Sequence, residues 1–411
     1  MMRPGLPMPI LRPGSVSDAF QATCSHPNVQ ANTMITAPIS EPEVCFHGGA
    51  FFEAIGESFE TLHRSAEVIN ADVLDAWFPP APGAVRDVSE YLPWLLRTSP
   101  PQESRGLVQA ISDARGIPSD SIAVGAGSSS LIYLAFREWL TQNSRVLLPD
   151  PTYGEYAHVL EEVIGCRTDR LPLSRADGFR IDPDYLLWAI AQARYDLVVL
   201  VNPNNPTGRL LPRALLEPVL ATAPSYTRIW IDEAYVEYAG RDESLEATAA
   251  DSPHVVVCKS LSKAYALSGA RAAYLCGHPS RMRPLRRLTP PWAVSLPAQV
   301  AAVAALRDPA YYEARYRETV LLRKALAASL RSAIPGVDVF EGVANFVLCT
   351  LPSSGPDAAT VCERCRMHNV YLRDFATMSR QLGRHALRIS VKEATTNVRI
   401  VDVLARAVAA G

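Results

Sequence analysis

The feature that most constrains this chain is a series of short apolar segments, each followed by a cluster of polar residues. Six such segments predict β-strands, at residues 122–124, 145–148, 197–201, 228–231, 255–258 and 272–276. Several are separated by segments with helical spacing, at 129–139, 156–164 and 215–221. Strands that lack polar alternation and are separated by helices indicate a mainly parallel sheet with both faces covered.

Sheets of this kind bind ligands beyond the carboxyl ends of their strands. The polar clusters of this chain lie at those ends, at residues 125–129, 150–153, 202–208, 232–235 and 259–263. Because the clusters follow successive strands, we expect them to meet at one edge of the sheet and to form one binding site.

The length of 411 residues is too great for one ordinary core and predicts two linked domains. We expect a flexible arm at 1–40 and a segment at 41–98 that joins the smaller domain. A large domain at 99–309 and a small α+β domain at 310–411 follow. Apolar residues with helical spacing also predict a helix over 50–69.

Composition excludes several classes of partner. The formal net charge of -2 offers no electrostatic footprint for nucleic acid. No apolar run is long enough to span a bilayer, and prolines interrupt the first 16 residues where a signal peptide would be apolar. We therefore expect a cytoplasmic protein.

The eight cysteines are scattered and do not form the pattern of a disulfide framework. Cys362 and Cys365, followed by His368, lie in a predicted helix over 357–368. A metal site would need a second pair of ligands, so we interpret these cysteines as buried structural residues and expect no metal.

Lys263 is the first candidate for chemistry. It follows an apolar strand, with Ser260 and Ser262 before it and Arg271 after it. A lysine that forms a Schiff base must be deprotonated part of the time, so it belongs in a desolvated or cationic setting. Hydroxyl groups and an arginine suit a phosphate dianion. Since most single lysines are solvated surface charges, this motif gains weight only together with the others.

Asp232 ends the predicted strand at 228–231. A carboxylate there can pair with a protonated pyridine nitrogen, which makes the ring an electron sink. The simpler interpretation is a helix N-cap before Ala234. Tyr235 can reach a phenolate oxygen of the same ring, or can simply pack in the core.

Other clusters offer groups for the ring and the phosphate of such a cofactor. Asn205 lies in a tight turn from which its amide can donate to the phenolate. Gly127 lets the backbone approach a phosphate at the start of a helix that opens with Ser128 and Ser129. Tyr153 can stack on an aromatic ring. Each motif is common by itself.

As a set, these motifs resemble the class I/II aminotransferase superfamily of pyridoxal-phosphate enzymes. The order of the phosphate turn, the stacking tyrosine, Asn-Asn-Pro-Thr-Gly, Asp-Glu-Ala-Tyr and Ser-Leu-Ser-Lys is the order of that superfamily. Residues 262–271 and 291–295 resemble the branch that holds histidinol-phosphate aminotransferase and threonine-phosphate decarboxylase. The resemblance covers about 100 to 300 and, more weakly, the rest to 411.

This resemblance implies an aspartate-aminotransferase-like α/β fold (fold type I), pyridoxal 5'-phosphate as the cofactor, and a homodimer with active sites at the interface. Lys263 would carry the cofactor as a Schiff base and move the proton at the substrate α-carbon, and Asp232 would hold the pyridine nitrogen. Asn205 and Tyr235 would bind the phenolate oxygen, and Tyr153 would stack on the ring.

The resemblance also implies two further sets of residues. The phosphate would be surrounded by Gly127, Ser128, Ser129, Ser260, Ser262 and Arg271. The substrate would be bound by Arg388, whose guanidinium would clamp a carboxylate, together with His47 and Asn345.

Three positions depart from the pattern of that branch. Residues 74–80 lack the asparagines of its Asn-x-Asn-Pro motif. Ser99 stands where a tyrosine reaches the neighbouring subunit's cofactor phosphate, and Lys392 where a second arginine lies near the carboxylate clamp. We therefore expect an intact cofactor site with a changed substrate pocket, so neither histidinol phosphate nor threonine phosphate is the expected substrate.

The leading hypothesis is an aminotransferase that acts on an L-α-amino acid through a quinonoid intermediate. A decarboxylase like the threonine-phosphate enzyme is one alternative, favoured by His-Gly-Gly at 47–49. A lyase or carbon–carbon bond-forming enzyme that uses β- or γ-elimination is another, motivated by the lost asparagine motif. A DNA-binding regulator of this fold would need a larger module than the 40-residue arm, and an inactive relative would be expected to lose Lys263 or Asp232.

Overall fold

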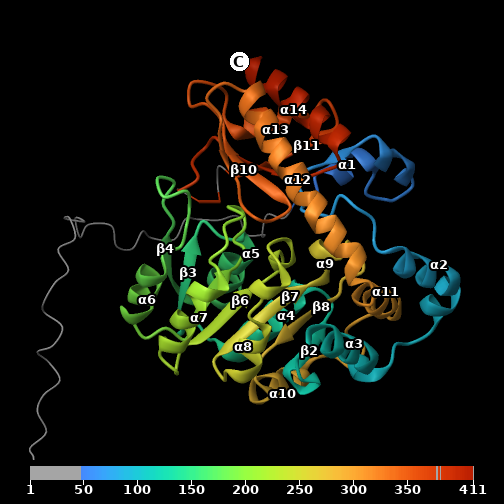
Figure 1. Ribbon diagram of the computed structural model, residues 1–411, viewed down its shortest axis with the longest axis vertical. Helices are drawn as coiled ribbons and strands as arrows, with labels where there is room; N and C mark the ends of the chain where they lie inside the picture. Colours follow the sequence, from blue (N-terminus) through green and yellow to red (C-terminus); the bar gives the residue numbers. More distant parts are fainter. Residues whose placement is uncertain (1–47, 376–377, 380, 411) are drawn as a thin grey trace, which may run out of the picture. The chain divides into compact units, whose positions relative to one another are not determined.

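The structure is a computed structural model that describes residues 48–375, 378–379 and 381–410. Its main feature is a seven-stranded sheet of order β2-β8-β7-β6-β5-β3-β4 (Figure 1). The strands are β2 (Ile122–Gly125), β3 (Arg145–Asp150), β4 (Arg167–Pro172), β5 (Leu197–Val201), β6 (Arg228–Asp232), β7 (Val255–Ser260) and β8 (Ala273–Cys276). Only the two pairings of β8 are antiparallel, which confirms the mainly parallel sheet expected from the sequence.

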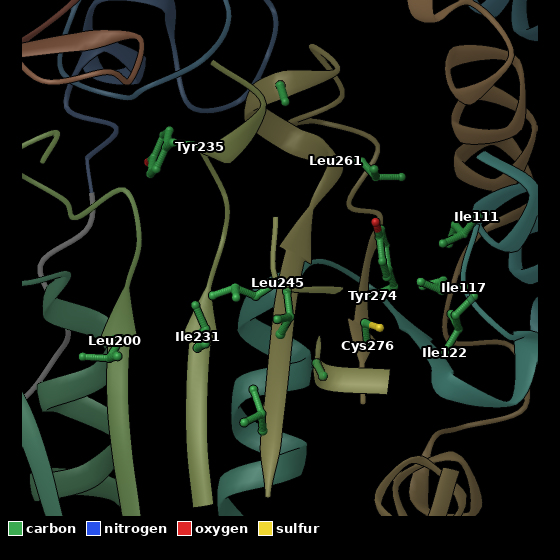
Figure 2. Close-up of a cluster of buried hydrophobic side chains, with 14 of the residues drawn as sticks. Ile111, Ile117, Ile122, Leu200, Ile231, Tyr235, Leu245, Leu261, Tyr274 and Cys276 are labelled. Carbon is green, nitrogen blue, oxygen red and sulfur yellow. The ribbon is translucent and has the colours of Figure 1, made fainter. Parts of the chain in front are cut away.

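Successive residues of the central strands are buried on opposite faces of this sheet, which explains why the strands are apolar throughout. On β5, Val198 and Leu200 belong to one core cluster, whereas Val199 and Val201 belong to another. Figure 2 shows part of the first cluster, with Leu200 on β5 and Ile231 on β6.

Helices cover the two faces of the sheet. The first face packs against α3 (Arg105–Arg115), α6 (Pro183–Ala191), α7 (Arg213–Thr222), α8 (Glu246–Asp251) and α11 (Leu296–Leu306). The second packs against α4 (Ser128–Trp139), α5 (Gly154–Ala157) and α10 (Pro279–Leu288). A short helix, α9 (Leu261–Ala264), follows β7 and carries Lys263.

A second, antiparallel sheet lies in the C-terminal part of the chain, with the order β12-β13-β10-β9. Its strands are β9 (Asp338–Phe340), β10 (Phe346–Thr350), β12 (Arg373–Asp374) and β13 (Ala386–Ser390). Its core is shared with α12 (Pro309–Ala333), α13 (Ala358–Arg366) and α14 (Ala394–Ala409).

The segment that follows residue 68 connects the two cores. Strand β1 (Ile69–Asn70) pairs in parallel with β11 (Val370–Tyr371). Ala71 is buried in the core of the C-terminal sheet, whereas Leu74 and Phe78 are buried in the core of the large sheet. Helix α2 (Pro82–Arg97) then packs against α11. The residues between Ala71 and Leu74 therefore pass from one core to the other.

The predicted helix over 50–69 is wrong. Helix α1 (Phe51–Ile55) ends at Gly56, which has a φ of +104°, and only a 3₁₀ turn (Leu62–Ala66) follows. A Cβ at Gly56 would collide with the side chain of Thr61, so the chain reverses too sharply for a continuous helix.

Two other sequence expectations concern single elements. The predicted helix over 156–164 is one turn of α5 followed by a π-helical segment (His158–Ile164). Cys362 and Cys365 are buried on α13, and burial raises the pKa of the Cys365 thiol to about 12.

Within the described residues, no helix combines the length and the apolar character that crossing a membrane requires.

Candidate active site

One cavity lies beyond the carboxyl ends of the central strands. Side chains that follow β3, β5, β6 and β7 line it, together with the first residues of α4 and with Arg388 of β13. The sequence predicted this convergence because parallel strands bring their carboxyl ends to one edge. The arginine from the second sheet makes the cavity a site shared by the two cores.

The N-terminus of α4 forms one end of the cavity. Gly127 is the N-cap of the helix, has a φ of +89° and carries no side chain that could cap the first N–H groups. This φ favours glycine, and a Cβ there would force the guanidinium of Arg271 to shift. Ser128 and Ser129 open the helix and line the cavity. Uncapped N–H groups, hydroxyls and a guanidinium together suit an anion.

The turn after β7 adds its hydroxyl groups to the same cavity. The Ser260 hydroxyl accepts a hydrogen bond of 3.3 Å from the backbone N–H of Ser262, which shapes the turn that leads to Lys263. All three residues line the cavity, as does Arg271. Arg271 adopts a φ of +58°, a conformation that non-glycine residues rarely adopt and that tends to occur at functional sites.

Asp232 lies at the end of β6 and is almost fully buried. Its Oδ2 accepts a hydrogen bond of 2.7 Å from the Tyr156 hydroxyl, and its Oδ1 accepts one of 3.0 Å from the backbone N–H of Ala234. Burial raises the pKa of this carboxyl to about 6, although the bond from Tyr156 works in the opposite direction. A carboxylate in this setting gains from a cationic partner, which a protonated ring nitrogen provides.

Lys263 lies on α9 and its amine is mostly buried. Burial lowers the pKa of Lys263, whereas the nearby carboxylate of Asp75 raises it. The Nζ atom of Lys263 lies 3.1 Å from Oδ1 of Asp75, in the segment that the sequence singled out for its missing asparagines. No local pattern in the sequence indicates this pairing, because 188 residues separate the two side chains.

Arg388 projects into the cavity from β13. It donates hydrogen bonds of 2.7 Å to the Asn205 Oδ1 and of 2.8 Å to the Asp72 carbonyl oxygen. Its guanidinium lies over the rings of Phe346 and Phe375, at 5.6 Å and 5.3 Å from their centroids. Burial lowers the pKa of Arg388 to about 10, and its Nε has no hydrogen-bond partner among the described residues. An anion would satisfy this buried cation.

A second arginine lies beside it, which differs from the sequence expectation. Arg373 of β12 stands directly opposite Arg388 in the antiparallel ladder and lines the same cavity. It forms an ion pair of 3.6 Å with Asp72. Sequence reasoning placed Lys392 at this position and missed Arg373, because a strand of two residues leaves no recognisable pattern.

Three aromatic and amide groups complete the predicted set. Tyr153, Asn205 and Tyr235 all line the cavity. Burial raises the pKa of both tyrosines, so they remain neutral hydrogen-bond donors. Since Asn205 accepts from Arg388 through its Oδ1, its amide nitrogen is the group left to donate.

Two other residues discussed from the sequence do not line the cavity. Asn345 is fully buried and its amide donates to the Leu74 carbonyl oxygen at 3.0 Å, so it supports the wall of the cavity and does not line it. Ser99 is exposed beyond the end of α2. His47 lies outside the described residues.

A buried ionic network lies behind the cavity and was not anticipated. Lys259 lies 3.2 Å from a carboxylate oxygen of Glu233 and 2.8 Å from one of Glu237. Glu246 and Arg115 extend the network, and Arg115 pairs with Glu237 at 2.7 Å. Glu233 directly follows Asp232 and Lys259 directly precedes Ser260, so their ion pair joins the two strand ends that carry site residues.

The donor set fits pyridoxal 5'-phosphate, the cofactor that the resemblance implies. Gly127 brings the start of α4 close to the guanidinium of Arg271, Asp232 offers a buried carboxylate, and Lys263 offers an amine whose pKa burial lowers. The Nε of Arg388, which has no hydrogen-bond partner among the described residues, remains for a substrate anion.

Comparison with known proteins agrees with this geometry. The model of the family described as aminotransferase class I and II matches residues 86–408. A histidinol-phosphate aminotransferase from Archaeoglobus fulgidus is 31% identical over 298 residues, which are 72% of this chain and 81% of that protein. An aromatic amino acid aminotransferase from Streptomyces avermitilis is 32% identical over 304 residues, 73% of this chain and 81% of the relative.

Among solved structures, the fold is similar to that of histidinol-phosphate aminotransferase from Sinorhizobium meliloti in complex with pyridoxal-5'-phosphate. The TM-score is 0.78 at 23% sequence identity, over 90% of this chain and 96% of the other.

Proposed function

Since the chain belongs to the class I and II aminotransferase family, whose cofactor is pyridoxal 5'-phosphate, we propose that it transfers the amino group of an L-α-amino acid, with the cofactor attached to Lys263. Two relatives of similar identity are named for different substrates, histidinol phosphate and aromatic amino acids. Their names support the reaction class and leave the substrate open.

The observation that carries this proposal is the meeting of Lys263, Asp232 and Arg388 in one cavity. When bound, the cofactor supplies an electron sink that stabilises negative charge at the substrate α-carbon. Asp232 supports that role because its buried carboxylate favours a protonated ring nitrogen. The hydroxyls and N–H groups at the start of α4 hold the phosphate at the end of the cavity that this helix forms.

Lys263 and the two arginines act on the substrate. A neutral Lys263 amine takes the proton from the α-carbon and, once protonated, can return it to a neighbouring carbon. Arg388, with Arg373 beside it, holds the substrate carboxylate in a fixed orientation. A substrate held at one end presents a defined bond to Lys263, which selects proton removal over loss of the carboxylate.

A half-reaction tests the proposal. The holoenzyme would be mixed with single amino acids while its absorbance spectrum is recorded, and the cofactor and product would be identified by mass spectrometry. We expect pyridoxamine phosphate together with a keto acid. Lys263→Ala should lose the absorbance band of lysine-bound cofactor, whereas Lys324→Ala makes the same change at an exposed position of α12 and should keep it.

The same experiment separates the alternatives. Release of carbon dioxide would favour the decarboxylase, whose sequence support at His47 lies outside the described residues. Release of a β- or γ-substituent would favour the lyase. Either product without a keto acid contradicts transamination, and the same cofactor band in Lys263→Ala as in the wild type would contradict the role of Lys263.

We also propose a homodimer that buries the exposed apolar side chains of α2. This helix exposes large apolar side chains, among them Tyr91, Trp94 and Leu96, the last with 72% of its surface exposed. One short helix with several large exposed apolar side chains suggests a contact surface, and a second copy of the chain is the partner that the family resemblance implies. Light scattering should give twice the chain mass of 44.8 kDa.

Two substitutions test the location of this interface. Leu96→Glu should convert the dimer to a monomer, because it places a charge in the buried contact. Leu321→Glu, at a similarly exposed position of α12, should leave the dimer intact. A monomeric wild-type protein, or a dimer that tolerates Leu96→Glu, would overturn the proposed interface.

A further inference from the structure

Asp72 contacts both arginines of the cavity. Nη1 of Arg373 lies 3.6 Å from Oδ1 of Asp72, and Nη2 of Arg388 donates a hydrogen bond of 2.8 Å to the carbonyl oxygen of Asp72. The two arginines stand opposite each other on β12 and β13. All three residues are buried and line the cavity, and we refer to them together as the arginine cluster.

The Asp72 carboxylate is held in place by the chain around it. Its Oδ2 accepts a hydrogen bond of 3.1 Å from the backbone N–H of Gly49, and a Cβ at Gly48 would lie only 2.7 Å from the same oxygen. Its Oδ1 has no hydrogen-bond partner among the described residues. The ion pair with Arg373 is therefore the contact that stabilises this buried oxygen.

The charges of the arginine cluster set a limit on what it can bind. Guanidinium groups stay protonated in proteins, so two arginines and one ionised carboxylate carry a net charge of +1. A single substrate carboxylate neutralises that charge. A second anionic group beside it would leave an uncompensated negative charge in a buried place, which is costly.

The other charged groups that line the cavity belong to its proposed cofactor side. Arg271 lies against the start of α4, and Glu155 accepts a hydrogen bond of 2.9 Å from Ser129 on that helix. Asp232 and Lys263 are the proposed partners of the ring and of the reactive carbon of the cofactor. Among the described residues that line the cavity, the arginine cluster is thus the cationic group that remains for the substrate.

Apolar side chains line the cavity next to the arginine cluster. Val73 directly follows Asp72, and Phe375 and Met378 follow β12. The Phe375 ring lies against the guanidinium of Arg388, with its centroid at 5.3 Å. A carboxylate held by Arg388 therefore has apolar surface beside it, which suits an uncharged substrate side chain.

We infer that Asp72 is a specificity-determining residue, which neutralises Arg373 and so restricts the site to amino acids with an uncharged, apolar side chain. The inference rests on the proposed function and deepens it by naming the substrate class. Dicarboxylic and phosphorylated amino acids bring a second anion and are excluded by charge. The same limit applies to the keto acid that receives the amino group, which would carry one carboxylate.

Two pairs of ligands that differ in one terminal group test this inference on the holoenzyme. Pentanoate and glutarate have the same number of carbons and cannot react, and glutarate carries a second carboxylate in place of the methyl group. Norvaline and glutamate are the corresponding amino acids. We expect calorimetry to give glutarate a dissociation constant at least about tenfold above that of pentanoate, because its second carboxylate finds no charged partner. Keto acid should form from norvaline in the same preference over glutamate.

Asp72→Asn should reverse this discrimination. The substitution frees Arg373 for a second anion, while the new amide oxygen can still accept the hydrogen bond from Gly49. The dissociation constant of glutarate relative to that of pentanoate should fall at least about tenfold. Asp72→Glu retains the charge and should keep most of the wild-type preference. Asp402→Asn, which removes an exposed carboxylate paired with Arg406, should keep all of it.

A double substitution identifies the arginine that Asp72 neutralises. Adding Arg373→Gln to Asp72→Asn removes the freed cation, so the gain in glutarate affinity should disappear. If the gain persists without Arg373, another group binds the second carboxylate and the inference is wrong.

The wild-type protein alone can also overturn the inference, by binding glutarate as tightly as pentanoate or by binding neither acid. An unchanged ratio of the two dissociation constants in Asp72→Asn would overturn it too. A substitution that merely loosens the site weakens both acids together and leaves that ratio unchanged, so structural damage cannot imitate the expected result.

The inference and the proposed function can fail separately. If the acids bind with the expected preference but no amino acid yields a keto acid, the proposed function fails alone. If norvaline and glutamate yield their keto acids equally well, transamination stands and the inference about Asp72 fails.

Discussion

The hydroxyl of Tyr156 donates a hydrogen bond of 2.7 Å to Oδ2 of Asp232 from a fully buried position. The indole N–H of Trp230 donates in turn to the Tyr156 oxygen at 2.8 Å. Because an indole can only donate, the Tyr156 proton must point towards Asp232. The hydrogen bonds from Trp230 to Tyr156 and from Tyr156 to Asp232 therefore run in one direction. They favour the ionised carboxylate that a protonated ring nitrogen needs.

Tyr156→Phe should weaken the binding of pyridoxal phosphate. The variant loses a hydrogen bond to a charged group, which is worth about 1.5–3 kcal/mol, so we expect the dissociation constant to rise at least about tenfold. Equilibrium titration followed by absorbance measures it. Tyr185→Phe removes a hydroxyl from a tyrosine that is partly exposed on α6 and serves as the control. Equal affinity in the two variants would show that the bond to Asp232 is unimportant.

Asp232→Asn should stabilise the cofactor-free protein above pH 6 while abolishing tight cofactor binding. Folding raises the pKa of Asp232 from 3.8 to about 6, so the folded state binds more protons between these values. The free energy of unfolding that the Asp232 carboxyl contributes therefore falls as pH rises from about 4 to 6. At pH 8 the ionised carboxylate lowers the free energy of unfolding by up to about 2–3 kcal/mol. Urea unfolding at pH 4 and pH 8 measures the difference. A variant less stable than the wild type at pH 8 would contradict this account.

Arg388→Lys should impair substrate binding more than cofactor binding. A lysine keeps the charge but loses the two-pronged guanidinium and its packing over Phe346 and Phe375. We expect KM for amino acids to rise roughly hundredfold, because a charge-assisted contact worth about 2–3 kcal/mol is lost. The affinity for pyridoxal phosphate should stay within a few-fold of the wild type. If KM rises as much for amines that lack a carboxylate, Arg388 does not clamp the carboxylate.

Lys259→Met should destabilise the fold. The substitution leaves Glu233, Glu237 and Glu246 buried with only Arg115 to balance them. Removing one partner of a buried ionic network costs about 3–5 kcal/mol, which urea unfolding would detect. Arg406→Met breaks an exposed pair with Asp402 on α14 and should cause no comparable loss. Equal midpoints for the two variants would mean that the network contributes little.

Sequence reasoning identified the central strands and most of the side chains that line the cavity because both depend on local patterns. The run Leu197–Val201 is apolar on both faces, which only a covered strand requires. Asp232 and Lys263 follow such strands directly, so their place at the sheet edge follows from topology alone. Strand β4 was not predicted because it is an edge strand with the partly polar sequence RTDRLP.

The substrate side of the site could not be predicted in the same way, because it depends on contacts between distant segments. Asp75 meets Lys263 across 188 residues, and Arg373 meets Arg388 through a strand of two residues. Helix α2 was also missed, since prolines at 82 and 93 conceal a helix of 16 residues. No local pattern predicts such pairings, because they form only when the two cores come together.

The parallel pairing of β1 with β11 has a consequence for how this protein is made. Ile69 finds its partner Val370 only after some 300 further residues have left the ribosome, and the loop that such a pairing closes is slow to form. The large sheet, complete at Cys276, can assemble while synthesis continues. Arg388 is made after that sheet, so a nascent chain would assemble the proposed cofactor side of the cavity before the arginine that we propose for the substrate carboxylate.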